Sequence, residues 1–236
     1  MVASSLKGAE CILLAGGLGT RLRSVVAELP KCMAPVAGRP FIDHVIDYFL
    51  SQGIEKFILA LGYKSEVIIE HVTSKYPALQ VKFSIEDEPL GTGGAILQAV
   101  KLCSSEIAIV TNGDTMYKVD LAAAENALNL STAACTLLLK PMENFSRYGV
   151  VEINTDNRIT AFKEKQQYDA GLINGGVYLL HVPRFLKEDF PQKFSFEKEY
   201  LETLYPQRKM FGLPQDAYFI DIGIPEDFQR AQEELC

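Results

Sequence analysis

Short apolar runs alternate with amphipathic stretches through about the first 140 residues of the chain. Runs of strand length, rich in Ile, Val and Leu, predict buried strands at 11–15, 57–61, 81–85, 107–111 and 134–139. Apolar side chains at helical spacing predict helices between them, at 41–50, 67–72, 94–102 and 120–130. Such a succession of strand–helix steps favours a mainly parallel sheet with helices on both faces.

After Pro141 the pattern changes to segments rich in β-branched and aromatic residues. Strands are predicted at 149–153, 158–162 and 172–181, a hairpin turn at 154–157, and helices at 194–204 and 226–235. These strands would extend the sheet in an antiparallel or mixed arrangement. We expect a single α/β domain over residues 1–236, with halves of about 1–140 and 141–236. Its fold would be three-layered and Rossmann-like, with a mixed, mainly parallel sheet and helices on both faces.

The composition narrows the class of protein. A net charge of −7 argues against general affinity for nucleic acid, because such binding depends on a basic surface. No apolar run approaches the roughly 18 residues that span a bilayer, so we expect no membrane segment. The five cysteines are scattered and form no Cys-x-x-Cys pair, which favours reduced thiols in a cytoplasmic protein. A polyanionic substrate would need a local cluster of cations.

A glycine-rich loop directly after the first strand carries the clearest chemical signal. Gly16, Gly17 and Gly19 lack a β-carbon, so the loop can turn its backbone N–H groups towards an anion. Arg21 and Lys31 would supply positive charge, which a mere chain reversal does not require. This loop lacks the third glycine of the dinucleotide-binding fingerprint. It also lacks the Gly-Lys-Ser or Gly-Lys-Thr that a P-loop requires. The loop therefore predicts a phosphate cradle of another kind.

At these positions the chain resembles the sugar nucleotidyltransferases, whose signature reads Gly-x-Gly-Thr-Arg-Leu, seven residues, then Pro-Lys. The matching residues are Gly17, Gly19, Thr20, Arg21, Leu22, Pro30 and Lys31. Within that family, the sequences at 23–26 and 31–35 look most like those of D-glycero-D-manno-heptose 1-phosphate guanylyltransferases. The resemblance implies transfer of a nucleotidyl group from a nucleoside triphosphate to a sugar 1-phosphate, with release of pyrophosphate. The implied substrates are GTP and a heptose 1-phosphate, bound by the first and second halves of the domain, and the implied cofactor is Mg²⁺.

Two aspartates follow apolar runs and are candidate metal ligands. Gly113 and Asp114 come after the strand 107–111, and ligands of open α/β sheets bind beyond the carboxyl ends of strands. Asp221 follows a second apolar run, although it could instead cap the helix that begins near Pro225. Mg²⁺ prefers one or two carboxylates together with phosphate oxygens and water. The resemblance implies that Asp114 and Asp221 hold the metal, and that Arg21, Lys31 and Lys165 complete the catalytic set.

The segment 88–95 resembles the base and ribose loop of the family, with glycines that would let a flat ligand lie against the backbone. A flexible helix entry is the alternative. Nucleotide contacts are expected from this segment, the glycine loop and the ends of strands, at Leu14, Ala15, Gly16, Gly17, Gly19, Thr20, Arg21, Lys31, Gly62, Tyr63, Pro89, Gly91, Thr92, Gly113 and Asp114.

Two motifs in the second half point to a sugar phosphate. The segment 162–165 resembles the family's Phe-x-Glu-Lys, which implies that Glu164 holds a sugar hydroxyl and Lys165 the phosphate, although Gln166 replaces the usual proline. Because side chains alternate along a strand, Phe162 and Glu164 would share one face and Lys163 and Lys165 the other. We expect only one lysine in the site, and by motif register it is Lys165. A solvated charge run is the alternative. The Asn-x-Gly-x-Tyr motif and its neighbours add Asn174, Gly175, Tyr178, Tyr148 and Gly149 to the expected sugar cavity.

The residues alone leave other functions open. A thymidylyl- or uridylyltransferase for a hexose 1-phosphate, a cytidylyltransferase for a phosphorylated alcohol, or a non-catalytic sugar-nucleotide sensor would share much of this pattern. The oligomeric state, including a possible homodimer, is also open.

Overall fold

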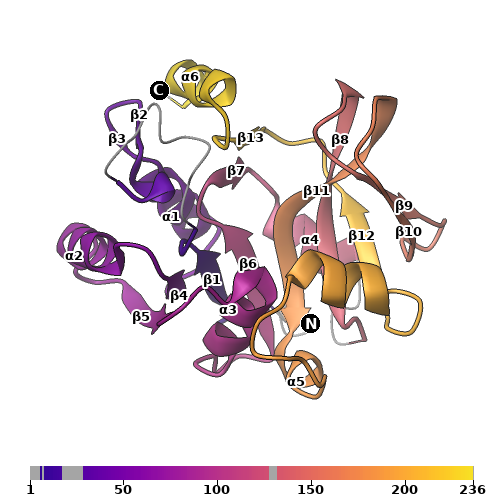
Figure 1. Ribbon diagram of the computed structural model, residues 1–236, viewed down its shortest axis with the longest axis horizontal. Coiled ribbons are helices and arrows are strands. Elements are labelled where there is room, and N and C mark those ends of the chain that lie inside the picture. The colour runs from indigo at the N-terminus through magenta and orange to yellow at the C-terminus, as the bar shows by residue number, and fades with distance from the viewer. Residues whose placement is uncertain (1–5, 7, 18–28, 128–131, 236) are drawn as a thin grey trace.

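The computed structural model describes residues 6, 8–17, 29–127 and 132–235 (Figure 1). The first half supplies four parallel strands, which lie in the order β6 (Ile107–Asn112), β1 (Glu10–Leu14), β4 (Lys56–Leu61) and β5 (Gln80–Ile85). The helices between them are α1 (Phe41–Ser51), α2 (Ser65–Lys75) and α3 (Gly91–Val100). The predicted succession of strands and helices is confirmed.

The second half continues the same sheet, which has nine strands in the described part of the chain. Strand β8 (Cys135–Phe145) begins where a strand was expected at 134–139 and runs on into the second half. The strands after it are β9 (Val150–Ile153), β10 (Ile159–Lys163), β11 (Tyr168–His181) and β12 (Met210–Pro214). Strand β11 runs antiparallel to both β6 and β8, and β12 runs parallel to β8. The mixed extension is confirmed. We did not predict β12, whose five residues include a glycine and end in proline.

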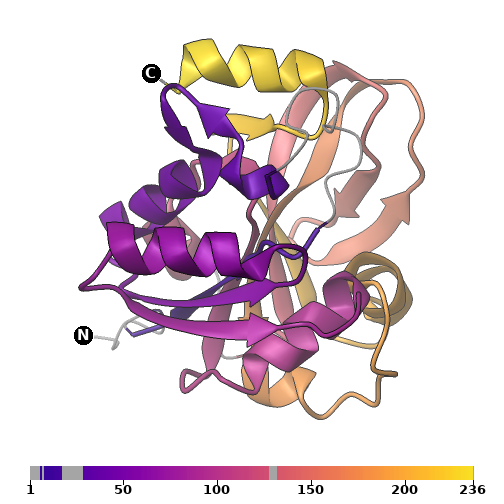
Figure 2. The ribbon, with the colours of Figure 1, turned by 60° about the vertical axis from the view of Figure 1, so that its left-hand side comes forward.

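Helices cover both faces of the sheet (Figure 2). Successive side chains of a strand point to opposite faces, so both faces carry apolar side chains that the helices bury. On β1, Leu13 packs into one core with α1 and α2, whereas Ile12 packs into the other core with α3. The remaining helices are α4 (Leu121–Ala127), α5 (Val182–Phe185) and α6 (Pro225–Glu234). No helix among the described residues has the length and apolar character needed to cross a membrane.

The helix expected at 194–204 has an unexpected form. Residues Phe196–Glu202 form a π-helix, η3, whose N-cap Ser195 accepts a hydrogen bond from the backbone N–H of Lys198. A π-turn holds one more residue than an α-turn, and it is frequently found at functional sites. Hydrophobic periodicity does not distinguish the two over such a short segment.

Several short elements lie at the carboxyl edge of the parallel strands. A single turn, η2 (Lys31–Met33), precedes the small hairpin of β2 (Pro35–Val36) and β3 (Arg39–Pro40). Strand β7 (Thr115–Tyr117) follows β6 and pairs with β13 (Phe219–Asp221), which comes from near the end of the chain. This two-stranded sheet joins the first half of the molecule to its last helix.

A buried carboxylate fastens the start of β1. The Glu10 side chain is 2% exposed and accepts hydrogen bonds from the backbone N–H groups of Ser104 (2.5 Å) and Ser105 (3.1 Å) and from Lys82 Nζ (3.1 Å). Burial alone would raise the pKa of Glu10, but these hydrogen bonds outweigh burial and the pKa lies below its usual value.

We expect Glu10→Gln to lower the free energy of unfolding by about 1–3 kcal/mol at pH 7, because hydrogen bonds to a charged acceptor are lost. A lowered pKa stabilises the fold above the unfolded pKa of about 4.3, and this contribution is lost as pH falls through the folded value. Urea unfolding between pH 3 and 7 would measure both effects. Exposed Glu55→Gln is the control. Equal stability of Glu10→Gln and wild type across that range would contradict the prediction.

Candidate active site

The two candidate metal ligands come together through backbone pairing. Asp114 follows β6, and Asp221 ends β13 opposite Thr115 of β7. The backbone N–H of Ile222 donates to the carbonyl oxygen of Asp114 (3.1 Å). The register of this short sheet therefore places both carboxylates at the same edge of the molecule.

The ammonium of Lys31 lies between these carboxylates. Its Nζ is 2.5 Å from Asp114 Oδ2 and 3.5 Å from Asp221 Oδ1, and the lysine side chain is only 11% exposed. We expected Lys31 to contact a triphosphate. In this structure it neutralises the aspartates, because two partly buried carboxylates repel each other without a cation between them.

Gly223 gives Lys31 and Asp221 the room they occupy. Its backbone N–H donates to Asp221 Oδ1 (2.8 Å). A β-carbon at Gly223 would lie 2.9 Å from Asp221 Oδ1 and 3.1 Å from Lys31 Nζ. Any larger residue at this position would therefore shift the carboxylate or the ammonium.

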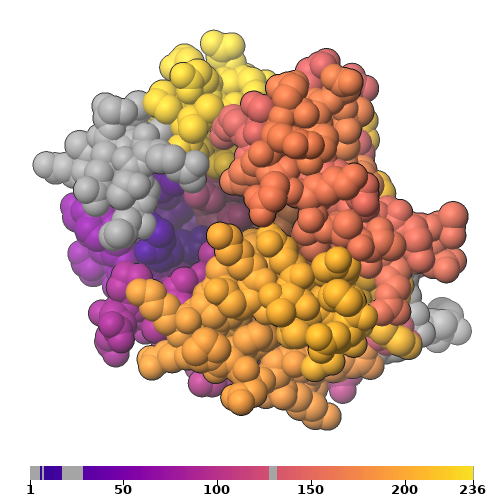
Figure 3. Space-filling model, turned by 45° about the vertical axis from the view of Figure 1, so that its right-hand side comes forward, coloured from indigo at the N-terminus to yellow at the C-terminus, as the bar shows by residue number. Residues whose placement is uncertain are grey.

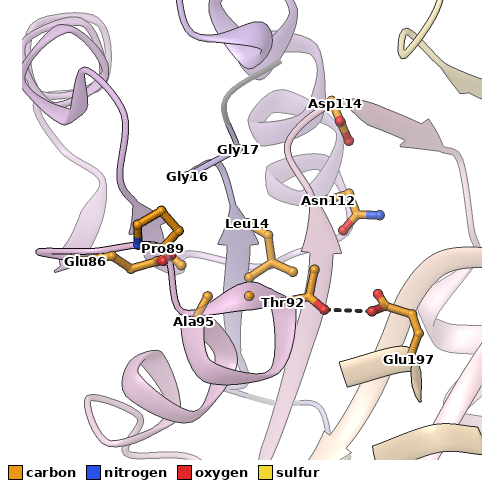
Figure 4. Close-up of a pocket in the computed structure, with 12 residues that line it drawn as sticks. Leu14, Gly16, Gly17, Glu86, Pro89, Thr92, Ala95, Asn112, Asp114 and Glu197 are labelled. Atoms are coloured by element: carbon orange, nitrogen blue, oxygen red, sulfur yellow. Dashed lines mark hydrogen bonds between the residues drawn. The ribbon is translucent and has the colours of Figure 1, made fainter. Parts of the chain in front are cut away.

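A cavity of about 540 Å³ leads to Asp114 (Figure 4). It is lined by Leu14, Gly16, Gly17, Ala60, Glu86, Pro89, Gly91, Thr92, Ala95, Asn112, Asp114 and Glu197. Glu86 and Pro89 lie at one end of the cavity and Asp114 at the other. Seven of the expected nucleotide contacts line it, namely Leu14, Gly16, Gly17, Pro89, Gly91, Thr92 and Asp114. Sequence reasoning missed the polar residues Glu86, Asn112 and Glu197.

Other expected nucleotide contacts lie elsewhere. Ala15, Gly62, Tyr63 and Gly113 are not among the residues that line the cavity. Two of these support it from behind. A β-carbon at Gly62 would lie 3.1 Å from the carbonyl oxygen of Gly16, and one at Gly113 would lie 3.0 Å from that of Leu14. Gly19, Thr20 and Arg21 lie outside the described residues.

The glycines that open α3 have a role that we did not predict. Gly91 has a φ of +73°, in the left-handed region. A β-carbon at Gly91 or Gly94 would lie 2.6 Å or 2.4 Å from the carbonyl oxygens of Phe194 and Gln192, and one at Gly93 would meet the Phe194 ring. These glycines therefore let the segment before η3 pack directly on α3.

Glu86 presents a carboxylate to the end of the cavity farthest from Asp114 (Figure 4). The backbone N–H of Leu90 donates to its Oε2 (2.9 Å), and its Oε1 lies against Gly16. Burial raises the pKa of Glu86 above its usual value, although the Leu90 hydrogen bond opposes this shift. The sequence offered one signal, because Glu86 directly follows strand β5.

A second cavity, of about 430 Å³, lies in the other half of the domain. It is lined by Gly149, Val150, Val151, Phe162, Lys163, Glu164, Lys165, Asn174, Ser195, Glu197, Lys198, Leu201 and Glu202. The expected residues Gly149, Glu164, Lys165 and Asn174 are among them. On the face shown in Figure 3, the surface is hollowed between η3 and strands of the second half.

Three expected sugar contacts do not line this cavity. Tyr178 is buried, and its hydroxyl accepts a hydrogen bond from Asn174 Nδ2 (2.9 Å). Gly175 gives room to the Tyr117 ring, which would lie 2.4 Å from a β-carbon at that position. Tyr148 packs edge-on against Phe219, with ring centroids 6.0 Å apart. Tyr178 therefore supports the cavity from behind through Asn174, which lines it.

The expectation that only one lysine of the segment 162–165 faces the cavity was wrong. Lys163, Glu164 and Lys165 all line it. Strand β10 ends at Lys163, so strand alternation does not govern the two residues that follow. Lys163 also forms an ion pair with Glu152 on the neighbouring strand β9.

Comparisons with known proteins agree with this geometry. The model of the family described as nucleotidyl transferase matches residues 10–236. The chain belongs to the nucleotidyl transferase family. The sequence-based assignment to the sugar nucleotidyltransferases is thereby confirmed.

Two similar curated relatives of this nucleotidyltransferase are D-glycero-alpha-D-manno-heptose 1-phosphate guanylyltransferases. That of Aneurinibacillus thermoaerophilus is 48% identical over 96% of this chain and 98% of the relative. That of Campylobacter jejuni is 44% identical over 93% of this chain and 96% of the relative. The crystal structure of HddC from Yersinia pseudotuberculosis complexed with GMP-PN is 37% identical, with a TM-score of 0.85 over 97% of this chain and 100% of HddC.

We expect Gly223→Ala in this nucleotidyltransferase to reduce turnover at least about tenfold, because the added methyl group would displace the Asp221 carboxylate, whose Oδ1 lies 2.9 Å from that position. Its cost to stability should stay below about 1 kcal/mol, since the Lys31 side chain can move aside. Steady-state pyrophosphate release and chemical unfolding would measure the two effects. Full turnover in a folded variant would show that the position of the Asp221 carboxylate beside Gly223 is unimportant.

Proposed function

We propose that this chain transfers GMP from GTP to D-glycero-α-D-manno-heptose 1-phosphate, forming GDP-heptose and pyrophosphate. The observation that carries this proposal is the arrangement of the two cavities. The first runs from Glu86 to the paired carboxylates, and the second meets it at Glu197. A nucleotide and a phosphorylated sugar bound in the two cavities would have their phosphates near Asp114. The heptose guanylyltransferases among the relatives support this choice of substrates.

Guanine fits the base end of the first cavity. A carboxylate accepts hydrogen bonds only, and guanine presents two neighbouring donors, N1–H and the N2 amino group. The Glu86 carboxylate is held in place by Leu90 and has one oxygen against Gly16. Uracil and thymine present a single N–H donor between two carbonyl oxygens. A carboxylate would repel these carbonyl oxygens. We therefore assign base selection to Glu86.

The chemistry requires positioning and charge neutralisation. An oxygen of the heptose phosphate attacks the α-phosphorus in line, and the bond from the α-phosphorus to the bridging oxygen of the β-phosphate breaks, so that pyrophosphate leaves. The attacking oxygen is already anionic, and no protein base is needed. Lys165 would hold the acceptor phosphate, while Lys31 and Arg21 would neutralise the triphosphate.

The carboxylate pair suits a divalent cation. Lys31 Nζ lies 2.5 Å from Asp114 and 3.5 Å from Asp221, and one positive charge between the two carboxylates supports this proposal. Among the described residues, no group of three or more acidic, histidine or cysteine side chains could hold a metal, so phosphate oxygens and water would complete the shell. Mg²⁺ bound by Asp114 and Asp221 would supply charge stabilisation to the phosphates.

We expect Asp114→Asn to reduce pyrophosphate release at least about a hundredfold with GTP, heptose 1-phosphate and Mg²⁺. Electrostatic stabilisation by a bound metal is worth several kcal/mol, and about 1.4 kcal/mol corresponds to tenfold in rate. The variant should remain folded, because Asp114 is partly exposed. Exposed Asp189→Asn is the control and should retain wild-type turnover. Wild-type turnover in Asp114→Asn would refute the proposed metal site.

We expect Glu86→Gln to lower kcat/KM for GTP by about 10- to 100-fold, the value of a charged hydrogen bond. The amide can pair with the donor and acceptor of uracil, so kcat/KM for UTP should fall less or rise. Pyrophosphate release across GTP, UTP, dTTP and CTP would measure this change. The matched control is exposed Glu70→Gln on α2, which does not line the cavity.

The same substitution carries a pH test. The pKa of Glu86 is raised by burial, and protonation removes one acceptor from the carboxyl group. As pH falls through this raised pKa, the KM for GTP should rise in wild type, whereas the Glu86→Gln variant should lack this rise. An unchanged nucleotide preference together with the same pH profile in both proteins would exclude Glu86 from base selection.

A further inference from the structure

Glu197 is the one residue that lines both cavities among those the structure describes. It belongs to the first turn of the π-helix η3, in the second half of the chain. Neither the glycine signature nor the sugar motifs include it. Its position places a carboxylate at the junction where nucleotide and sugar phosphate would meet.

Hydrogen bonds orient the Glu197 carboxylate. Its Oε2 accepts hydrogen bonds from Thr92 Oγ1 (2.6 Å) and Ser195 Oγ (2.9 Å), and Figure 4 shows the first of these. Thr92 Oγ1 in turn accepts a hydrogen bond from the backbone N–H of Phe196 (2.9 Å). Within the described part of the chain, the other oxygen, Oε1, has no hydrogen-bond partner. Oε2 thus fixes the orientation of the side chain, and Oε1 can accept a hydrogen bond from a ligand.

The chemistry of a carboxylate limits what this oxygen can bind. An ionised carboxylate has acceptors and no donors, so it repels phosphate oxygens and binds hydroxyl groups. At the junction the acceptor phosphate must reach the region of Asp114. The sugar carbon next to the one that bears the phosphate carries the nearest hydroxyl group of the acceptor.

Asn112 faces the same space and strengthens this assignment. Its side chain lines the nucleotide cavity and lies between Asp114 and Thr92 in the view of Figure 4. The glycine at position 176 makes room for it, since a β-carbon there would lie 2.7 Å from Asn112 Nδ2. An amide can both donate to and accept from a hydroxyl group, so Asn112 and Glu197 could share one.

We propose that Glu197 is a specificity-determining residue for the acceptor sugar, and that its free oxygen accepts a hydrogen bond from the hydroxyl group at C2, next to the anomeric carbon. This inference rests on the proposed transfer of GMP to a heptose 1-phosphate. It adds a residue on η3, Glu197, that selects the acceptor and whose carboxylate is oriented by Thr92 of α3.

The test compares heptose 1-phosphate with its 2-deoxy analogue as acceptors for GTP. In wild type, kcat/KM should be about 10- to 100-fold lower for the 2-deoxy acceptor, because a charged hydrogen bond is lost. In Glu197→Gln this preference should fall at least threefold, and in Glu197→Ala it should nearly vanish. The matched control is Glu199→Gln. Exposed Glu199 accepts a hydrogen bond from the Ser195 backbone N–H (2.8 Å) but does not line either cavity.

A purely structural role for Glu197 would slow both acceptors equally and leave their ratio unchanged, and this result would overturn the proposal. The proposal would also fail if the variants lost a preference for GTP over 2′-deoxy-GTP while keeping the preference for the C2 hydroxyl group, because the carboxylate would then bind ribose. If wild type released no pyrophosphate from GTP and heptose 1-phosphate, the proposed function would fail together with the inference. An unchanged acceptor preference in active variants would remove only the inference.

Discussion

The ion contact among Lys31, Asp114 and Asp221 is the constraint on which the site depends. Three segments from distant parts of the chain supply these charges, and the pairing of β7 with β13 brings the two carboxylates within reach of one ammonium. Each carboxylate is partly shielded from water, so their repulsion must be neutralised by a nearby cation. In the free protein, the Lys31 ammonium supplies this neutralising charge.

The other part of the site depends on close backbone packing. Glycines in the first turn of α3 admit the segment before η3, and this contact carries Glu197 to the edge of the nucleotide cavity. The hydrogen bond between Thr92 and Glu197 then connects a residue that lines the first cavity to a residue that lines both cavities. Packing and the shape of the site are therefore coupled, because a side chain on any of these glycines would displace the segment before η3, which borders the second cavity.

Selectivity and chemistry come from different residues. In the proposed reaction, the glycine loop and the paired aspartates would bind phosphate groups, which every substrate of that reaction contains. Glu86 and Glu197 meet the proposed nucleotide and sugar where substrates differ, in the base and in the hydroxyl groups. Both are carboxylates whose orientation is set by neighbouring donors, Leu90 for Glu86 and Thr92 for Glu197. A fixed acceptor discriminates between ligands better than a mobile one, because it cannot rotate to suit a wrong partner.

The sequence by itself determined the family, the parallel first half and which two aspartates lie together, Asp114 and Asp221. Hydrophobic periodicity and motif spacing are local properties of the chain, so they can be recognised without the tertiary structure. It did not reveal strand β12 or the π-helix η3, which tertiary packing stabilises. Nor did it place Lys31 between the carboxylates, or show that Lys163 and Lys165 both face one cavity. These facts depend on strand register and on where elements end. Contacts between segments far apart in the chain leave little trace in either segment alone, so only the tertiary structure decided them.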